Sequence, residues 1–346
     1  MRRQLNTLYV TTEGAWLRKD GANLVMEVEG EERARLPAHM LEGLVCLGRV
    51  SVSAPLLGYC TEQGITVSYL NPHGRFLARV EGPVSGNVLL RREQYRRSDD
   101  PQGSAEIVRN FLIGKIYNQR SVIGRARRDH ADKLAAEDMA QLDDAHRRLQ
   151  RIGDRLLLER DVDTLRGCEG DAARIYFSVF NHLILVNSPA FAFNGRSRRP
   201  PLDRMNALLS FLYTLLTHDC RSALETVGLD PAVGYLHRDR PGRPSLALDL
   251  AEELRPVLAD RLALSLVNRR QVAERDFRVL ENGAVLLSDE ARKTVLVAYQ
   301  ERKQDELQHS FLNEKAAMGL FPFIQAQLLA RHLRGDLDAY PPLLWK

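Results

Sequence analysis

The apolar residues of this chain change their spacing partway along, and that change restricts the fold more than any other feature. Residues 1–81 alternate apolar and polar positions in short runs, which is typical of β-strands, and the Asp20-Gly21 pair predicts a tight hairpin turn. In residues 104–346, apolar positions recur at i, i+3, i+4 and i+7, the spacing of amphipathic helices. We therefore expect an α+β chain, in which a small β-sheet or sandwich domain precedes a larger all-α domain.

Residues 82–103 separate these two patterns. The segment begins with Gly82 and Pro83, and residues 98–103 are rich in Ser, Asp, Pro and Gly, which is typical of a linker. The run between them predicts a short helix. The expected division is a β domain over 1–81, a linker with a short helix over 82–103, and a helical domain over 104–346. Within the helical domain, the spacing predicts helices over 104–124, 131–151, 171–187, 202–227 and 245–266, and a hairpin at Asn282-Gly283.

Composition excludes several classes of protein. Hydrophobic residues make up 44% and charged residues 27% of the chain, as in soluble globular proteins. No apolar run reaches the roughly 18 residues of a membrane span, and the N-terminus lacks the apolar run of a signal peptide, so we expect a cytoplasmic protein. The cysteines are widely spaced without a Cys-x-x-Cys pair, which favours reduced thiols over a zinc or redox motif. These are Cys46, Cys60, Cys168 and Cys220.

One imidazole and three carboxylates are concentrated in residues 228–256. His237 ends a turn, and Asp249, Glu252 and Glu253 follow at the spacing i, i+3 and i+4, which places them on one helical face. Leucines alternate with these carboxylates, so we expect them to be partly buried and to need a cation. Histidine with carboxylates suits Mg²⁺ or Mn²⁺, or alternatively Zn²⁺. Taken singly, each has an ordinary explanation: a structural histidine, a helix-terminal charge at Asp249, and a solvent-facing Glu253.

Glu169 is a second candidate, because Gly167 and Gly170 lie close on either side of it. We expect it just ahead of a helix over 171–187, where flanking glycines permit close approach of a ligand. The alternative is a carboxylate that accepts hydrogen bonds from the free N–H groups of the helix start. No His-Glu-x-x-His, Walker-type, Gly-x-Ser-x-Gly or Rossmann motif competes for the chemistry.

Arginines gather near these candidates. The net charge is only +4, but residues 85–130 hold ten Lys/Arg against five Asp/Glu. Arginines beside a divalent-metal site are what a phosphodiester substrate requires, although each cluster alone is more often a solvated face. Such contacts position DNA without reading its sequence. The clusters are Arg125, Arg127 and Arg128; Arg147, Arg148 and Arg151; Arg196, Arg198 and Arg199; and Arg238, Arg240 and Arg243.

Together, motifs along essentially the whole chain resemble those of the CRISPR-associated integrase family (Cas-one) of the spacer-adaptation complex. The sequences of these motifs are most similar to the subtype I-C branch of that family. The helical part carries Gly167-Cys-Glu169-Gly-x-Ala-Ala-Arg174, Gly228-Leu-Asp-Pro-x-x-Gly-Tyr-Leu-His237 and Asp249-Leu-x-Glu252. The β domain carries Leu36-Pro-Ala-His39, Val50-Ser-Val-Ser-Ala-Pro55, Cys60-x-x-x-Gly64 and Asn71-Pro-His-Gly-Arg75, and the linker carries Gly86-Asn-Val-Leu-Leu-Arg91-Arg-Glu-Gln94-Tyr95.

The resemblance implies a metal-dependent DNA endonuclease and integrase. The 3′-hydroxyl ends of short DNA fragments would attack phosphodiesters of a repeat array by transesterification, with Mg²⁺ or Mn²⁺ polarising the phosphate. It implies Glu169, His237 and Glu252 as catalytic metal ligands, with Asp249 as an auxiliary ligand or a partner of a ligand. Because two of the arginine clusters flank predicted loops and Arg174 lies in the Glu169 motif, we expect DNA contacts from Arg174, Arg196, Arg198, Arg199, Arg238, Arg240 and Arg243.

The resemblance also implies partners. These are double-stranded DNA as fragment and as repeat array, a second copy in a homodimer built through the β domains, and a small ferredoxin-like protein whose dimer bridges two such homodimers. Two alternatives remain open. The chain could be a nucleic-acid-binding scaffold without its own catalysis, or a general metal-dependent phosphodiesterase for small substrates. The absence of a compact His/Asp-rich metallophosphatase motif weighs against the latter.

Overall fold

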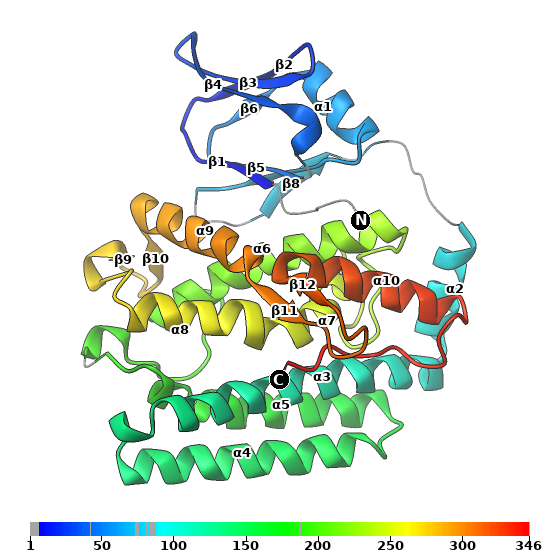
Figure 1. Cartoon of the computed structure of the whole chain (residues 1–346), viewed down its shortest axis with the longest axis vertical. Coiled ribbons are helices and arrows are strands. Elements are labelled where there is room, and N and C mark those ends of the chain that lie inside the picture. Colours follow the sequence, from blue (N-terminus) through cyan, green and yellow to red (C-terminus); the bar gives the residue numbers. More distant parts are fainter. Residues whose placement is uncertain are drawn as a thin grey trace. The chain divides into compact units, whose positions relative to one another are not determined.

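The computed structural model describes residues 7–41, 43–72, 76–80, 82, 88–186 and 188–345. It separates into two compact units, Met1–Gly86 and Asn87–Lys346 (Figure 1). The helix α2 (Val88–Asp99), which corresponds to the short helix expected within the linker, belongs to the second unit. A first unit of strands and a second unit made mainly of helices confirm the α+β class.

In the described part of the first unit, the strands form two four-stranded sheets. In the order β1-β5-β7-β8, β5 runs parallel to β1 and β7, and β8 is antiparallel to β7. In the order β4-β3-β2-β6, three strands form an antiparallel meander and β6 runs parallel to β2. The elements are β1 (Thr7–Val10), β2 (Trp16–Asp20), β3 (Asn23–Val28), β4 (Glu31–Pro37), β5 (Gly43–Leu47), β6 (Ser51–Val52), α1 (Ala54–Glu62), β7 (Thr66–Leu70) and β8 (Phe76–Val80).

The hairpin expected at Asp20-Gly21 is confirmed, because β2 and β3 pair with Asp20 opposite Asn23. Gly21 has a φ of 56°, in the left-handed region that such a turn uses. The strand β4 was not expected from the sequence. It lies at the edge of its sheet, and its charged side chains are mostly exposed, so the strand has no clear apolar alternation.

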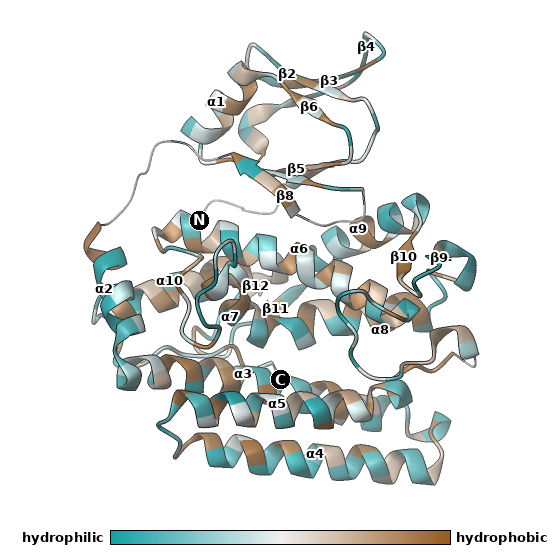
Figure 2. Cartoon of the chain, turned by 180° about the vertical axis from the view of Figure 1, so that it is seen from behind, coloured by the Kyte–Doolittle hydropathy of each residue, from teal (hydrophilic) through white to brown (hydrophobic). Residues whose placement is uncertain are grey.

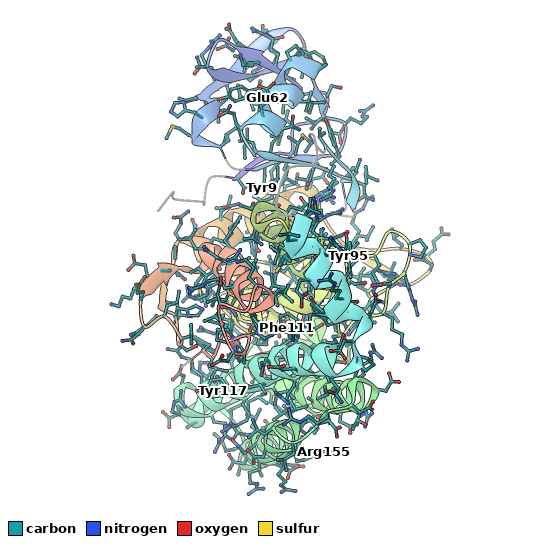
Figure 3. All side chains as sticks on the ribbon, turned by 90° about the vertical axis from the view of Figure 1, so that its right-hand side faces the viewer. Tyr9, Glu62, Tyr95, Phe111, Tyr117 and Arg155 are labelled. Carbon is teal, nitrogen blue, oxygen red and sulfur yellow. The ribbon has the colours of Figure 1, made fainter. Side chains whose placement is uncertain are left out.

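The second unit is built around the long helix α3 (Pro101–Asp129), which Asp100 caps by accepting hydrogen bonds from two backbone N–H groups. It packs against α4, α5 and α7. Figure 1 shows α3, α4 and α5 side by side, and Figure 3 places Phe111 of α3 among the packed helices. The helices and strands that follow are α4 (Ala136–Leu156), α5 (Val162–Ser178), α6 (Arg204–Val227), α7 (Ser245–Leu254), α8 (Arg261–Asn268), β9 (Phe277–Val279), β10 (Val285–Leu287), α9 (Asp289–Gln304), β11 (Glu306–Gln308), β12 (Lys315–Ala317) and α10 (Phe321–Leu333).

The helix expected over 171–187 is wrong at both ends. Helix α5 begins at Val162, where Asp161 accepts a hydrogen bond from the Thr164 N–H, and it ends at Ser178. The two glycines around position 169 lie inside this helix, because a buried apolar face outweighs the roughly 1 kcal/mol that each glycine costs in a helix. The hairpin at Asn282-Gly283 is confirmed as β9 and β10.

Apolar faces hold the helices together. The buried positions of α4 are spaced by three, four and seven residues, and Figure 2 shows hydrophobic and hydrophilic bands along this helix. All four cysteines are buried free thiols, as expected. In the segments that the structure describes, no helix is both long and apolar enough to cross a membrane.

A π-helical segment, Arg255–Asp260, joins α7 to α8. Pro256 lies in its first turn and lacks the N–H that a continuous α-helix would need there. The segment ends at Asp260, which is buried and accepts a 2.6 Å hydrogen bond from the Tyr213 hydroxyl. Burial raises the pKa of Asp260 to about 6, although the Tyr213 hydroxyl opposes that shift.

Asp260→Asn should therefore gain stability relative to the wild type as pH rises. The folded protein keeps the Asp260 proton up to about pH 6, whereas an unfolded chain releases it near pH 4, so the wild type loses stability between these values. We expect the free energy of unfolding of the variant, minus that of the wild type, to increase by roughly 2 kcal/mol between pH 4.5 and pH 7.5. Urea unfolding at both pH values measures it, and a difference independent of pH would contradict it.

Candidate active site

The residues singled out in the sequence converge from three separate elements of the second unit. Glu169 lies in α5, His237 in the loop before α7, and Asp249 and Glu252 in α7 itself. Lys115, from the middle of α3, connects them. Its ammonium contacts Oε1 of Glu169 and lies 2.7 Å from Oε2 of Glu252, so α3, α5 and α7 meet at one charged cluster.

Asp249 orients the imidazole of His237. Its Oδ1 lies 2.6 Å from Nδ1 of His237, which leaves Nε2 facing Glu252 at 3.9 Å from Oε1. The same carboxylate accepts hydrogen bonds from the backbone N–H groups of Tyr235, Leu236 and His237 at 2.7 to 3.0 Å. Asp249 is fully buried and all these contacts bind its carboxylate to the loop. Asp249 therefore has the geometry of a residue that fixes the orientation of a neighbouring side chain, the His237 imidazole.

Gly234 allows the loop to come this close to α7. A Cβ atom at this position would lie 2.8 Å from Oδ2 of Asp249 and 2.8 Å from Cβ of Ser245. Both neighbours are fixed in the buried first turns of α7, so neither could give way cheaply. Glycine is required here by the close approach of two backbones.

Two more segments brace the His237 loop. The buried side chain of Gln94, from α2, donates to the backbone oxygens of Asp230 and Val233 at 2.7 and 2.9 Å and accepts from the Asp230 N–H. From α5, Nε of Arg166 donates to the Leu236 oxygen at 2.7 Å. The loop is therefore held by hydrogen bonds on several sides.

Glu252 is a buried carboxylate with two cationic neighbours. Nη1 of Arg255, one helical turn further on, contacts its Oε1, and the Lys115 ammonium lies beside its Oε2. Burial alone would raise the pKa of Glu252, but Arg255, Lys115 and His237 outweigh it and hold the pKa well below its usual range. Burial would likewise lower the pKa of Lys115, but Glu252 and Glu169 raise it above its ordinary value. Glu252 is thus ionised and Lys115 protonated.

The expectation that Glu253 faces solvent is wrong. Its side chain is fully buried and accepts hydrogen bonds from the Tyr340 hydroxyl, from Nε2 of Gln325 at 3.0 Å and from the Leu343 N–H at 2.7 Å. Burial raises its pKa to about 7. One residue along a helix is a turn of roughly 100°, so Glu253 points away from Glu252, toward α10 and the C-terminal segment.

The donor types in this cluster are those that bind divalent cations, although the Lys115 ammonium lies between the two carboxylates. Among the described residues, no three His, Cys, Asp or Glu side chains are arranged as a ready metal cage. Glu169 and Glu252 nevertheless supply carboxylate oxygens, and Nε2 of His237 is directed at Glu252. Oε2 of Glu252 is buried, and the atom that faces it is the Lys115 ammonium at 2.7 Å. Oxygen and imidazole donors of this kind suit Mg²⁺ or Mn²⁺.

The arginines expected on DNA divide into two groups. Arg196 is turned inward: its Nη1 donates to Oδ1 of Asn206 at 2.6 Å, and its guanidinium lies 5.1 Å from the ring centre of Tyr213. Burial lowers its pKa, so this side chain is already engaged in the interior. The other six are exposed or partly exposed: Arg174, Arg198, Arg199, Arg238, Arg240 and Arg243.

Some of the exposed arginines are close to one another. Burial lowers the pKa of Arg243, and the charges of Arg240 and Arg199 lower it further, so two separate loops bring their cations together. Arg238 makes a 3.0 Å ion pair with Asp163 at the start of α5. The His237 loop therefore carries positive charge on its solvent side.

The sequence analysis did not identify Lys115 and Arg255 as site residues, although a local feature of the sequence points to each of them. Lys115 interrupts an otherwise apolar stretch of α3 and lies one turn after the buried Phe111, a position at which lysine needs a buried partner. Arg255 follows Glu252 at i+3, the spacing of an ion pair on a helix.

Asp249→Ala should loosen the His237 loop. The substitution removes the acceptor of three backbone N–H groups, and hydrogen bonds to a charged group contribute about 1.5–3 kcal/mol each. We expect the free energy of unfolding to fall by roughly 3 kcal/mol and the amides of Tyr235, Leu236 and His237 to exchange hydrogen faster. Hydrogen-exchange mass spectrometry measures the latter. Asp239→Ala, which changes an exposed carboxylate of the same loop, should leave these amides unaffected; equal protection in both variants would contradict the assignment.

The chain is similar to known proteins over its full length. Residues 8–301 match the family model described as CRISPR associated protein Cas1. The chain is 61% identical over 350 residues to the CRISPR-associated endonuclease Cas1 2 of Rhodospirillum rubrum, with 100% of both chains covered. Its fold resembles a solved chain of a Cas6-RT-Cas1–Cas2 complex (TM-score 0.82, 24% identity, 100% of this chain and 36% of that one). It also resembles a casposase bound to integration product (TM-score 0.82, 21% identity, 99% and 94%). The chain therefore belongs to the Cas1 family of CRISPR-associated proteins.

Proposed function

We propose that this chain is a metal-dependent DNA endonuclease and integrase of CRISPR adaptation. It joins the 3′-hydroxyl ends of short DNA fragments to phosphodiesters of a repeat array by transesterification. The observation that carries the proposal is the charged cluster of Glu169, His237 and Glu252, which lies beside loops rich in exposed arginine. The name of the Rhodospirillum rubrum relative supports the endonuclease part.

The cation in this proposal is Mg²⁺ or Mn²⁺, held by Glu169, Glu252 and Nε2 of His237. When bound, it would polarise the phosphodiester and stabilise the charge that develops on the leaving oxygen. The donor types support this choice, since carboxylates and imidazole bind these ions.

The other residues near the proposed ligands orient these side chains, keep them ionised or bind DNA. Asp249 fixes the tautomer and direction of the His237 ring, which keeps Nε2 turned toward Glu252. Arg255 keeps Glu252 ionised inside the protein, so that its oxygens can act as ligands. Exposed arginines of the loops 196–199 and 238–243 hold the DNA backbone by its phosphates, which makes binding sensitive to salt.

The proposal includes partners. The protein binds double-stranded DNA, forms a homodimer through the β domain, and works in the cytoplasm with a small ferredoxin-like adaptation protein of a subtype I-C system. The solved Cas6-RT-Cas1–Cas2 complex supports association with a second CRISPR-associated protein. The basic loops support DNA as the substrate.

The proposed ligands can be tested by strand transfer of a short duplex into a supercoiled plasmid. We expect product with Mn²⁺ or Mg²⁺, none with EDTA, and a loss on the order of 100-fold or more in Glu169→Gln, His237→Ala and Glu252→Gln. Asp171→Asn, an exposed carboxylate of the same helix α5, is the matched control and should stay active. Circular dichroism checks that each variant folds.

Two results would contradict the proposal. If product still forms with the folded His237→Ala variant or in EDTA, the proposed metal site is not required for the reaction. If the wild type binds DNA but forms no product even with the small partner protein added, the chain is a nucleic-acid-binding scaffold without its own catalysis.

Lys115 generates a second prediction, because its ammonium lies where a cation between the two carboxylates would lie. Lys115→Met removes this internal cation. We expect the metal-free variant to unfold at a lower temperature, since Glu252 loses a partner, and to bind Mn²⁺ roughly tenfold more tightly, about 1.4 kcal/mol, since nothing competes with the metal. Isothermal titration and thermal unfolding measure both. Lys115→Arg keeps the charge and is the control; weaker Mn²⁺ binding by Lys115→Met would show that the lysine supports the metal instead.

A further inference from the structure

A pocket unconnected with the proposed ligands lies along the C-terminal half of α3. It has a volume of about 310 Å³ and is bounded by α3, by α4 and by the C-terminal segment. Neither Glu169, His237 nor Glu252 lines it. Part of its wall comes from the arginine cluster at residues 125–128, which the proposed function leaves without a role. Tyr117, which is labelled in Figure 3, also lines the pocket.

The lining is strongly cationic. Arg120, Arg125 and Arg128 of α3 face His146 of α4, and no carboxylate is part of the lining in the described structure. Among the described residues, Arg125 makes one ion pair, with Asp129 at 3.5 Å. Nε of Arg120 is buried without a hydrogen-bond partner among the described residues. The three guanidinium groups of the lining therefore have few acidic partners, and the pocket carries a net positive charge that an anion could neutralise.

The pKa of His146 is affected by the same positive charges. Burial lowers its pKa, and the positive charges of Arg120 and Arg127 lower it further. Asp143 acts in the opposite direction but is itself paired with Arg127. An anion in the pocket would be attracted by this potential and would relieve the repulsion among its cations.

The pocket is built on rigid elements. Trp345 is buried, and the centre of its ring lies 5.2 Å from the guanidinium of Arg125 and 4.5 Å from that of Arg261. The backbone N–H of Trp345 donates to Oδ1 of Asn118 at 2.7 Å, which fixes the C-terminal segment to α3. The ring that Arg125 contacts therefore belongs to a segment that is hydrogen-bonded to α3.

Gly124 is part of the wall of the pocket. A Cβ atom at Gly124 would lie 3.5 Å from Nε2 of His146 and 3.7 Å from Nη1 of Arg128, in the space between them. This glycine lies inside a helix, where it costs about 1 kcal/mol relative to alanine. Larger side chains at this position would project into the hollow.

We propose that this pocket binds a terminal phosphate, a phosphate monoester carried by a ligand of nucleotide size. Guanidinium groups bind phosphate oxygens in pairs, and a monoester offers three such oxygens and nearly two negative charges. The volume is at the lower end of the range for small-molecule sites and exceeds what a phosphate ion alone would fill. The source of the monoester is either a free nucleotide or the phosphorylated end of a DNA strand.

Binding can be measured on the full chain in EDTA, which keeps the test independent of the proposed metal chemistry. The probes are adenosine 5′-monophosphate, adenosine, and a short single-stranded oligonucleotide with and without a 5′-phosphate. We expect each phosphorylated probe that binds to do so at least tenfold more tightly than its unphosphorylated counterpart. Binding of the mononucleotide identifies a free nucleotide as the ligand, and binding of the phosphorylated oligonucleotide alone identifies a DNA end.

Variants locate the site. Arg120→Gln and Arg128→Gln should each weaken binding of the phosphorylated probe at least tenfold, whereas Arg147→Gln, an exposed arginine of α4 outside the pocket, should not. Gly124→Leu keeps every charge but fills the hollow, and it should abolish binding while the chain stays folded by thermal unfolding. Affinity that ignores the phosphate, or that is unchanged in the pocket variants, would overturn the proposal.

Discussion

The burial of one negative charge, on Glu252, organises the helical unit. An ionised carboxylate inside a protein must be paired, and removing one partner of such a pair costs about 3–5 kcal/mol. Glu252 is paired twice, with Arg255 from the segment that follows and with Lys115 from α3. Lys115 in turn contacts Glu169 of α5. Three helices are thus brought together by a charge that the interior would not accept alone.

The same constraint explains details of the backbone nearby. Gly114, next to Lys115, lets α3 approach α7 so closely that a Cβ atom there would lie 2.9 Å from Oε2 of Glu253. Gly234 does the same for the His237 loop, in which three consecutive N–H groups, from Tyr235 to His237, donate to Asp249. Charges and glycines therefore act together: the glycines permit the short distances that the buried ion pairs need.

Much of this could be predicted from the sequence, and the failures have physical causes. Spacing and turn residues predicted the β-to-helix change and the 20–21 hairpin, because these depend on local preferences. Residue 169 was expected before a helix because its flanking glycines suggest a break, but tertiary packing extends α5 across them. The direction of Glu253 and the part played by Lys115 depend on elements distant in sequence, α10 and α5, which no local pattern indicates.

Helix α3 carries two groups of cations whose charges are used differently. Lys115 points at carboxylates and is neutralised inside the protein, whereas Arg120 and Arg128, roughly one to four turns further along, line a hollow without acidic residues. A cation that is already paired offers little to a phosphate, because a new contact would break an existing one. The availability of positive charge to ligands is therefore decided by which carboxylates the neighbouring helices supply. Helix α5 and helix α7 supply them at position 115, whereas the acidic residues near the arginine pocket, Asp129 and Asp143, pair with Arg125 and Arg127 and are not part of its lining.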